Sequence, residues 1–392
     1  MKARRVLLSR SLRAVVDGAM AVLLPAYLLE LGFGTFEVGV IATATMLGSA
    51  FATLAVGAFG HRLSRYPLLP AAGVLMALTG LGFAGLHAFA ALLAVAFVGT
   101  LNPSSGDVSV FLPLEHARIA ASATGHERTS LFARYSVLGA VCAAAGALAA
   151  GVPDLLVARF GFARLAGLEA MFLVYAIVGA AVAMVYAGDR IDPASARVVP
   201  LGPSRGIVVK LATLFSVDSF AGGLVVNSLL ALWLLQRFGL SLAQAGTFFF
   251  AAGLLSATSQ FLAARLSRRI GLLNTMVFTH IPASMFLIGA AFAPTLPLAL
   301  ALLLCRSALS QMDVPARSAY VMAVVTPAER PAAASFTAVP RSLASAVSPT
   351  LAGAMFAAGW IATPLVACGL LKIVYDLVLW RACRGQPLDG AS

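Results

Sequence analysis

Long apolar runs follow one another along nearly the whole of this sequence, and each run is long enough to cross a lipid bilayer. A helix that spans the roughly 30 Å hydrocarbon core needs about 20 predominantly apolar residues. Of the 392 residues, 60% are hydrophobic and only 11% are charged, and the mean hydropathy is +0.95. The alternating ~10-residue segments typical of transmembrane β-barrels are not seen. The sequence therefore predicts an all-α polytopic membrane protein.

Turn residues between the apolar runs divide the chain into twelve expected transmembrane helices. Glycine and proline mark several junctions, among them Pro153 and Pro294. The first run follows a basic stretch, as in a signal peptide, but it carries Asp17 and lacks a small-residue cleavage site, so we expect it to be retained. The expected spans are 11–30, 37–58, 68–86, 88–113, 131–151, 166–187, 207–235, 242–263, 271–293, 296–322, 332–357 and 361–381.

Short matches recur in the same order in the two halves of the chain, at an offset near 200 residues. There are five matches: Val16-Asp17 with Val217-Asp218; Gly32, Glu37 and Gly39 with Gly239, Gln244 and Gly246; residues 62–65 with the identical residues 265–268; Asp107-Val108 with Asp313-Val314; and Glu127-Arg128 with Glu329-Arg330. Ordered matches of this kind indicate internal duplication, as in many transporters. We expect two pseudo-symmetric six-helix bundles, at 1–187 and 207–392, joined by a cytoplasmic central loop at 188–206.

The formal charge of +12 is concentrated in alternate loops. The basic clusters lie at the amino terminus, after spans two, six and eight, and at the carboxyl end, whereas the intervening loops hold only Arg159, Arg164 and Arg237. The positive-inside rule then puts both termini in the cytoplasm. Basicity here sets orientation and does not indicate a nucleic-acid partner. The compact loops and short termini favour the inner membrane of a bacterium.

The loop after span two resembles a known signature. The major facilitator superfamily (MFS) carries a Gly-x-Leu-Ala-Asp-Arg-x-Gly-Arg-Arg type motif there, and this chain has Gly57 to Tyr66, including Arg62 and Arg65. The second copy is similar at Arg265, Arg268 and Arg269. The motif aspartate is His61 in the first copy and Ala264 in the second. The resemblance implies the MFS fold and a gate on the cytoplasmic side whose details differ from those of the family.

Polar residues inside the apolar runs are the candidate solute site. Arg306 lies about 15 Å into span ten, by the 1.5 Å rise of a helix, which is close to the midplane. A guanidinium there suits a carboxylate or phosphate, although a structural ion pair with a neighbouring helix is the alternative. Asn102 and Asn227 lie at comparable depth in spans four and seven. They could line the solute pathway or form interhelical hydrogen bonds.

Carboxylates within the spans are candidates for proton coupling or for gating. Asp17 and Asp218 are equivalent in the repeat, and each is either a proton carrier or part of a gate, with Arg134 and Arg341 as possible partners. Asp107 and Asp313 lie nearer the cytoplasmic ends, where a structural role at a gate is favoured. Two i,i+4 pairs are expected within helices: Asp313 with Arg317, and Lys372 with Asp376.

No enzyme site is expected from this sequence. The histidines and cysteines show no metal-ligand spacing, no Gly-x-x-x-x-Gly-Lys phosphate loop is present, and we expect no cofactor and no bound metal. The function predicted is secondary active transport of a small solute by alternating access, with proton-coupled efflux preferred. The alternatives are an uptake symporter or facilitator for a small organic anion, and a non-transporting receptor or assembly subunit. The expected partners are the solute, protons and the lipid bilayer, and we expect a monomer.

Overall fold

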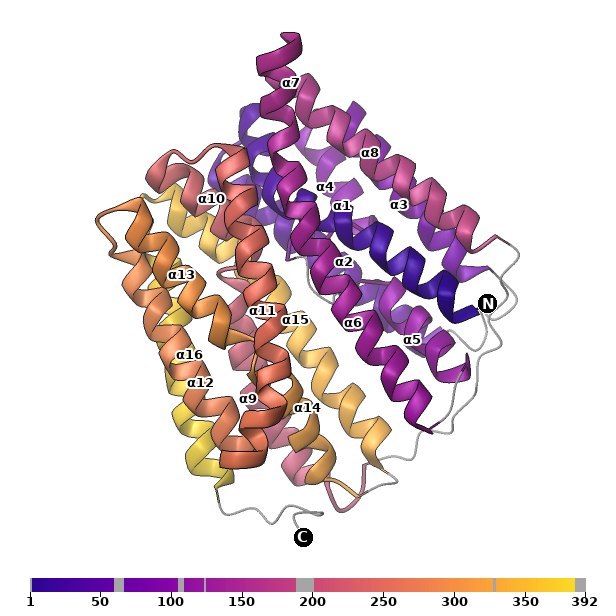
Figure 1. Ribbon diagram of the computed structural model, residues 1–392, viewed down its shortest axis with the longest axis vertical. Helices are drawn as coiled ribbons and strands as arrows, with labels where there is room; N and C mark the ends of the chain where they lie inside the picture. The colour runs from indigo at the N-terminus through magenta and orange to yellow at the C-terminus, as the bar shows by residue number, and fades with distance from the viewer. Residues whose placement is uncertain are drawn as a thin grey trace. The chain divides into compact units, whose positions relative to one another are not determined.

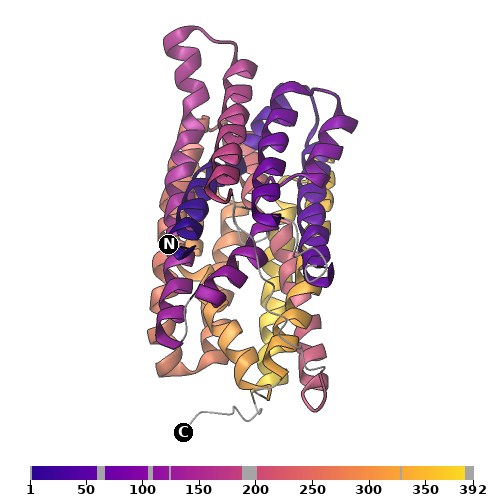
Figure 2. The same cartoon turned by 90° about the vertical axis from the view of Figure 1, so that its right-hand side faces the viewer.

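Every element in the described part of the chain is a helix (Figures 1 and 2). The computed structural model describes residues 2–59, 67–104, 109–122, 125–187, 201–326 and 329–384. In the first half the helices are α1 (Lys2–Glu30), α2 (Thr35–Phe59), α3 (Leu68–Gly85), α4 (Phe89–Val98), α5 (Phe111–Ser122), α6 (Gly125–Leu148), the 3-10 turn η1 (Ala149–Gly151), α7 (Val152–Phe160) and α8 (Arg164–Val185). In the second half they are α9 (Arg205–Gly223), α10 (Asn227–Phe238), α11 (Leu242–Ile270), α12 (Leu272–Ala291), α13 (Leu296–Ser310), α14 (Asp313–Ala323), α15 (Arg330–Ala357) and α16 (Thr363–Cys383).

The predicted all-α polytopic architecture is confirmed. Among the described residues, 10 helical segments are long and apolar enough to cross a membrane. Two of the twelve expected spans are outside that set. The fourth is divided between the short helices α4 and α5, and the eleventh corresponds to α15, whose apolar residues are diluted by serine, threonine and arginine.

Three expected spans are interrupted, which the sequence analysis did not predict. The fourth contains a break between α4 and α5, where Gly99 and Pro103 are poor helix formers. The tenth breaks between α13 and α14, because the ring of Pro315 conflicts with continuing the helix through the carbonyl of Gln311, four residues earlier. The seventh breaks between α9 and α10, directly after Gly223. A break frees backbone polar groups inside the bilayer, so each needs partners from neighbouring helices.

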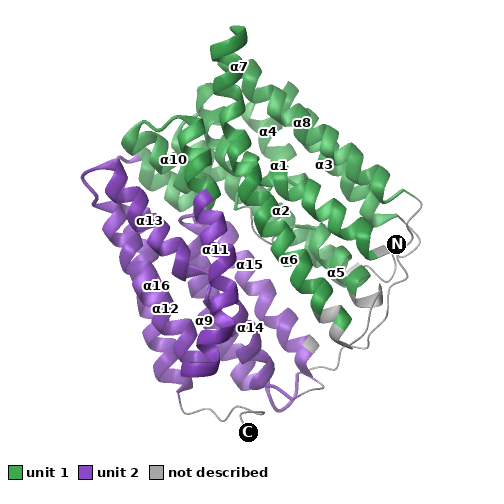
Figure 3. Cartoon of the chain, viewed as in Figure 1, with its two compact units in different colours: residues 1–195, 226–250, 349–357 green, residues 196–225, 251–348, 358–392 purple. Residues whose placement is uncertain are grey.

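Contacts divide the described chain into two compact units (Figure 3). Unit 1 comprises residues 1–195, 226–250 and 349–357, and unit 2 comprises 196–225, 251–348 and 358–392. Unit 1 thus contains α10, the start of α11 and the end of α15, which belong to the second half of the sequence. In unit 1, α1 packs against α6 and α3 packs against α8; in unit 2, α12 packs against α16, so the third and sixth spans are neighbours in both halves.

Glycine allows the closest helix contacts in unit 1. A Cβ atom on Gly18 in α1 would lie 2.0 Å from the carbonyl oxygen of Ala143 in α6, and one on Gly146 would lie 1.8 Å from that of Val15. The backbones of α1 and α6 therefore touch directly, as expected for an Ala- and Gly-rich transmembrane surface. A similar crossing joins α2 to the end of α15, where Gly39 and Gly353 meet.

Strongly basic loops and weakly charged loops alternate along the chain, so each helix has two distinguishable ends. We call the ends beside the arginine- and lysine-rich loops the basic ends, and the others the opposite ends. The start of α12 and the end of α16 are basic ends, and the start of α16 is an opposite end. The distances below along a helix are measured from these ends.

Candidate functional site

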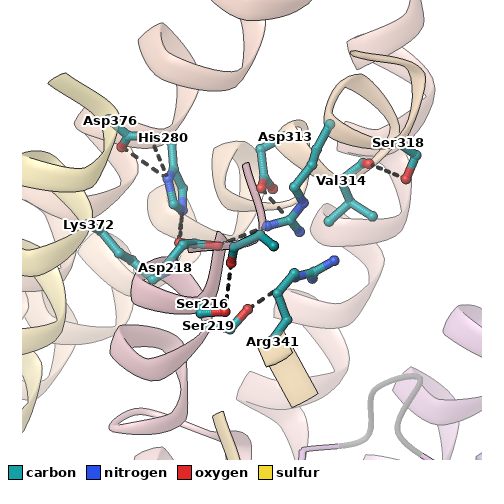
Figure 4. A network of polar contacts seen from close by, with 12 residues as sticks. Ser216, Asp218, Ser219, His280, Asp313, Val314, Ser318, Arg341, Lys372 and Asp376 are labelled. Atoms are coloured by element: carbon teal, nitrogen blue, oxygen red, sulfur yellow. Dashed lines mark hydrogen bonds and ion pairs between the residues drawn. The ribbon is translucent and has the colours of Figure 1, made fainter. Parts of the chain in front are cut away.

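Six charged or titratable side chains from four helices of unit 2 form one buried cluster (Figure 4). Apart from the Lys372 side chain, which is 12% exposed, each member is buried. We refer to the set as the ionic cluster. Its members are Asp218 of α9, His280 of α12, Asp313 and Arg317 of α14, and Lys372 and Asp376 of α16.

Asp218 is the centre of the ionic cluster. Its Oδ2 atom accepts a hydrogen bond of 2.9 Å from Arg317, and its Oδ1 atom accepts one of 2.5 Å from Lys372. Burying a single carboxylate in apolar surroundings is strongly unfavourable, and two cations in contact offset that cost. Asp218 therefore has the environment of a carboxylate held in its ionised form.

His280 joins α12 to α16. Its Nδ1 atom lies 3.2 Å from Oδ1 and 3.0 Å from Oδ2 of Asp376, and its Nε2 atom lies 3.3 Å from Nζ of Lys372. A lysine ammonium can only donate, so Nε2 is the acceptor and the proton of the neutral ring is on Nδ1, where it is donated to Asp376. The protonation state of the ring is thus linked to the position of Lys372.

Asp376 has no permanent cation in direct contact. Asp218 contacts Arg317 and Lys372, and Asp313 pairs with Arg317 at 3.4 Å, whereas His280 is the only ion-pair partner of Asp376 among the described residues. With a neutral imidazole, the pair carries one negative charge in a buried position. One additional proton, on either side chain, makes the pair neutral. Chemically, this arrangement can bind and release a proton.

Arg341 of α15 lies beside the ionic cluster without joining it. The side chain is half-buried, and its Nε atom donates to Oγ of Ser219 at 3.2 Å. Asp218, for which Arg341 was the expected partner, is instead paired with Arg317 and Lys372. The expected i,i+4 pair of Asp313 and Arg317 is present. The expected pairing of Lys372 with Asp376 is wrong, because each contacts a residue of another helix.

A second buried cluster lies in unit 1 around Glu115 of α5, which is 0% exposed. Its carboxylate accepts hydrogen bonds from Arg13, from Ser9 at 3.0 Å, from Tyr135 at 2.6 Å and from Tyr186 at 2.7 Å. Both oxygens are fully used, and a permanent cation balances the charge. This cluster is suited to holding α1, α5, α6 and α8 together, and it offers no place for an additional proton.

The first-half acid predicted from the repeat is not equivalent to Asp218. Asp17 is buried in α1, and the cations whose charges act on it are Arg13 and Arg10, from the same helix. Arg134, its expected partner, is exposed on α6. The two members of the repeat pair therefore have different surroundings: Asp218 contacts cations from two other helices, while Asp17 has neighbours one and two turns away on its own helix.

Arg306 is half-buried on α13, and no carboxylate of the described residues pairs with it. The neighbouring titratable group is the Cys368 thiol of α16. One residue further along α13, the carbonyl of Ser307 accepts a hydrogen bond of 3.2 Å from Ser256 of α11. A guanidinium with free donors is therefore available on this helix.

Asn102 and Asn227 are brought together by the breaks in the fourth and seventh spans. Asn102 is buried and accepts hydrogen bonds from the backbone and hydroxyl of Ser104, at 3.1 and 2.8 Å. The side chain of Asn227 donates to the carbonyl of Ser104 at 3.0 Å, and the backbone N–H of Ser228 donates to that of Pro103, also at 3.0 Å. These contacts supply partners for the backbone groups that the breaks release.

The loop-motif residues fall into two groups. Gly57 lies near the end of α2, while Arg62, Arg65 and the Asp107 of the repeat lie outside the described residues. In the second copy Arg265, Arg268 and Arg269 are exposed in the last turns of α11. Positive charge at that end is favourable, because the carbonyl groups there carry partial negative charge.

Sequence reasoning missed the two residues that organise the clusters. His280 was considered only as a metal ligand, and Glu115 was placed in a loop because the fourth span was expected to end at 113. The available signal was position: a histidine inside an apolar run, and a glutamate shortly after one. Partners separated by about 100 residues cannot be identified from spacing.

Comparisons with known proteins agree with this architecture. The sequence profile of the Major Facilitator Superfamily matches residues 6–305 and again residues 211–389. An uncharacterized membrane protein of Saccharomyces cerevisiae, YJR124C, is 23% identical over 96% of this chain and 92% of its own length.

Solved transporter structures share the fold. The inward-open conformation of the xylose transporter XylE from E. coli has a TM-score of 0.75 and 15% identity, covering 100% of this chain and 98% of that one. The nucleoside transporter NupG, as a D323A mutant, has a TM-score of 0.73 and 14% identity, covering 97% and 98%. The duplicated helical architecture and the profile match over both halves lead to one conclusion: the chain belongs to the Major Facilitator Superfamily of solute transporters.

Proposed function

We propose that this transporter is secondary active and that it couples solute movement to proton movement through the His280–Asp376 pair. The observation that supports the proposal is that Asp376 has His280 as its only ion-pair partner among the described residues and no permanent cation in contact, so that one proton neutralises the pair. The other two carboxylates of the cluster already contact Arg317 or Lys372. Alternating access of the solute site to the two sides of the membrane is part of the same proposal.

A proton on Nε2 of His280 would remove the acceptor that Lys372 now uses. The ammonium would then have Asp218 as its remaining contact, and two positive groups would face each other across 3.3 Å. Lys372 and Asp376 are on α16, His280 is on α12 and Asp218 is on α9. Protonation of His280 therefore changes which of these helices are linked by hydrogen bonds within the cluster. The proton therefore binds one arrangement of the helices more tightly than the other. Any coupling requires such a difference in affinity.

The charged groups around His280 bear on its protonation. Among the described residues, Asp218 from α9 and Lys372 and Asp376 from α16 lie within 4 Å of the ring. Arg317 and Asp313 from α14 and Arg341 from α15 interact with Asp218 or with one another. Arg341 is half-buried and bonded to Ser219, so its charge acts at longer range than that of Lys372. Of the charged groups that contact the ring, Asp376 is the nearest at 3.0 Å, followed by Lys372 at 3.3 Å and Asp218 at 3.8 Å.

The proposal is tested in proteoliposomes that contain a trapped pH dye and no initial gradient. A panel of organic anions, organic cations, nucleosides and sugars is added outside, and lumenal pH and solute content are recorded together. Efflux by proton antiport, the direction we propose, makes the lumen alkaline as solute enters; uptake symport makes it acidic. His280→Gln and Asp376→Asn should retain solute movement while losing the pH change.

His87→Gln is the matched control. His87 is an exposed histidine in the loop between α3 and α4, and it pairs with Glu169 near the start of α8. It should keep both signals. The coupling proposal is rejected if His280→Gln moves protons with solute in the same ratio as the wild type.

A second candidate, a facilitator or symporter for a small organic anion, is favoured by Arg306. A half-buried guanidinium with no carboxylate partner among the described residues can bind a carboxylate or phosphate through two parallel hydrogen bonds. Arg306→Gln should weaken transport of an anionic solute at least about tenfold, and Arg306→Lys should restore only part of it, because an ammonium cannot form the fork. Unchanged transport in Arg306→Gln removes this candidate.

Orientation is part of the proposal. The basic loops support an inner-membrane protein with both termini cytoplasmic, and the internal repeat supports two bundles at 1–187 and 207–392. Cysteines introduced at exposed positions in the last turns of helices, such as Arg237→Cys at an opposite end and Arg268→Cys at a basic end, should react with an impermeant maleimide from the outside only in the first variant.

A further inference from the structure

A pocket of about 340 Å³ opens at the basic ends of unit 2, away from the ionic cluster. Its walls come from the end of α11, the start of α12, and from α14 and α16. The residues that line it are Ile270, Gly271, Leu272, Leu273, Asn274, Tyr320, Trp380, Cys383 and Arg384. Cavities of this size are typical of small-ligand sites.

The start of α12 supplies backbone donors to this pocket. Gly271 has a φ of 85°, which allows the tight turn between α11 and α12. The first hydrogen bond within the helix runs from Thr275 to Gly271 at 3.1 Å, so the N–H groups of Leu272, Leu273 and Asn274 precede it and have no acceptor within the helix. Helix starts of this kind bind phosphate and other oxyanions.

A second, independent feature is the hydroxyl of Tyr320. The residue lines the pocket and is 1% exposed, yet the hydroxyl makes no hydrogen bond with any described group. The Cys383 thiol is its polar neighbour, and a thiol is too weak a hydrogen-bonding partner to satisfy a buried hydroxyl. A buried hydroxyl without a partner is unfavourable by about 1–3 kcal/mol. A ligand with an acceptor oxygen in the pocket would satisfy it.

Charge and apolar surface complete the site. The guanidinium of Arg384 lies over the ring of Trp380, 5.0 Å from its centroid, and both residues line the pocket. The indole Nε1 donates to Asn274 at 3.2 Å, which fixes the ring. Ile270, Leu272 and Leu273 supply an apolar wall. A cationic rim beside an aromatic and aliphatic wall suits an anionic head attached to an apolar body.

We infer that this pocket binds a phosphate ester, held by the α12 N–H groups, the Tyr320 hydroxyl and Arg384. The ester could be the headgroup of an anionic phospholipid of the surrounding leaflet or a soluble phosphate ester. Both offer the same acceptor oxygens. Binding here would stabilise the junction of α11, α12, α14 and α16 and is independent of the proton-coupling proposal.

The test measures thermal stability of delipidated, detergent-solubilised protein. Phosphatidylglycerol, glycerol phosphate and diacylglycerol are titrated separately. Because a ligand that binds only the folded state raises its stability, phosphatidylglycerol should raise Tm by a few degrees with saturation, and diacylglycerol, which has the tails without phosphate, should not. A saturating rise with glycerol phosphate as well assigns the site to soluble phosphate esters; a rise with phosphatidylglycerol alone assigns it to lipid.

Two variants make the test specific. Tyr320→Phe and Arg384→Gln should each increase the half-saturating concentration about tenfold or more, since each removes one bond to a charged group. Arg381→Gln is the control, because Arg381 is exposed at the same end of α16 and does not line the pocket. It should respond like the wild type.

Tyr320→Phe also distinguishes a ligand-binding hydroxyl from a purely structural one by the direction in which Tm changes. Without ligand, it removes an unsatisfied buried group, so Tm should stay the same or rise; with phosphatidylglycerol, its Tm should fall below that of the wild type. The inference is overturned if no phosphate ester raises Tm, if diacylglycerol acts as well as phosphatidylglycerol, or if Tyr320→Phe and Arg384→Gln respond like Arg381→Gln.

Discussion

His280 and Asp376, on different helices, form a buried hydrogen-bonded pair in which the imidazole Nδ1 lies 3.0 Å from a carboxylate oxygen. Asp376 is 1% exposed and His280 4%. From Leu272 to His280 the rise along α12 is about 12 Å, so the pair lies within the depth of the bilayer. A histidine–aspartate pair at that depth, next to a salt-bridged aspartate, is present in unit 2. In unit 1 the buried carboxylate of Glu115 is fully bonded, and Asp17 has cations of its own helix nearby.

Removing the central charge of the ionic cluster should destabilise the protein strongly. In Asp218→Asn, Lys372 loses its carboxylate and Arg317 keeps only Asp313, so we expect the free energy of unfolding to fall by about 3–5 kcal/mol. Adding Lys372→Met should recover part of the loss, since it removes the orphaned cation. Denaturation in mixed micelles measures this. Asp154→Asn on α7, whose carboxylate is outside the cluster, should change stability by less than about 0.5 kcal/mol.

The Glu115 cluster should respond to the loss of single donors. Tyr186→Phe removes a 2.7 Å bond to a buried carboxylate, and we expect a loss of about 1.5–3 kcal/mol in unfolding free energy. Glu115→Gln should lose more, because its amide group would face donors such as Arg13. Ser318→Ala, which removes an exposed hydroxyl, serves as the reference. Equal stability of Tyr186→Phe and Ser318→Ala would contradict this account of the cluster.

The crossing of α2 and α15 should not accept a side chain. A Cβ on Gly39 would lie 2.5 Å from the carbonyl oxygen of Pro349, so Gly39→Val should force these helix ends apart. Thr350, whose hydroxyl lies 2.8 Å from that of Thr43, should then become accessible. The measurement is maleimide labelling of Thr350→Cys in a background without native cysteines.

Gly85→Val is the matched control for that experiment, because a Cβ on Gly85 meets nothing within 4 Å. Labelling should increase in Gly39→Val only. Similar labelling rates in both variants would mean that the crossing tolerates the added volume.

The free energy of unfolding at low pH should depend on the ionisation of Glu329. Hydrogen bonds from the Ser204 hydroxyl, the Gly202 N–H and the Thr326 hydroxyl lower the pKa of Glu329 to about 2. Its pKa is higher in the unfolded chain, so the ionised form stabilises the folded state fully above about pH 4.5, and this contribution disappears as pH falls toward 2. Glu329→Gln should flatten the profile of unfolding free energy against pH over that range.

The sequence was sufficient for the architecture because hydropathy, turn residues and loop charge all act locally. The Ala143 to Gly146 stretch was likewise recognisable as a packing surface, and Gly146 does contact α1. The break at Gln311 was in principle visible, since Pro315 follows four residues later. The break near Asn102 was visible in the same way, since Gly99, Asn102 and Pro103 interrupt the apolar run.

The candidate site was less predictable because its pairs are not local. Asp218 was identified from the repeat, but its partners Arg317 and Lys372 are 99 and 154 residues away. Spacing along a helix favoured Lys372 with Asp376, whereas packing of α9 and α12 against α16 offered better partners to both. The Asp313–Arg317 pair persists beside a competing charge, because the guanidinium contacts Asp313 through one nitrogen and Asp218 of α9 through the other.

The glycine contact between α1 and α6 has a practical consequence for spectroscopy. With Gly18 against Ala143 and Gly146 against Val15, neither helix can rotate or slide without a collision of main-chain atoms. A pair of labels on these two helices should report the same separation at every stage of the transport cycle. Such a pair is an internal ruler, against which distance changes elsewhere in the molecule can be calibrated.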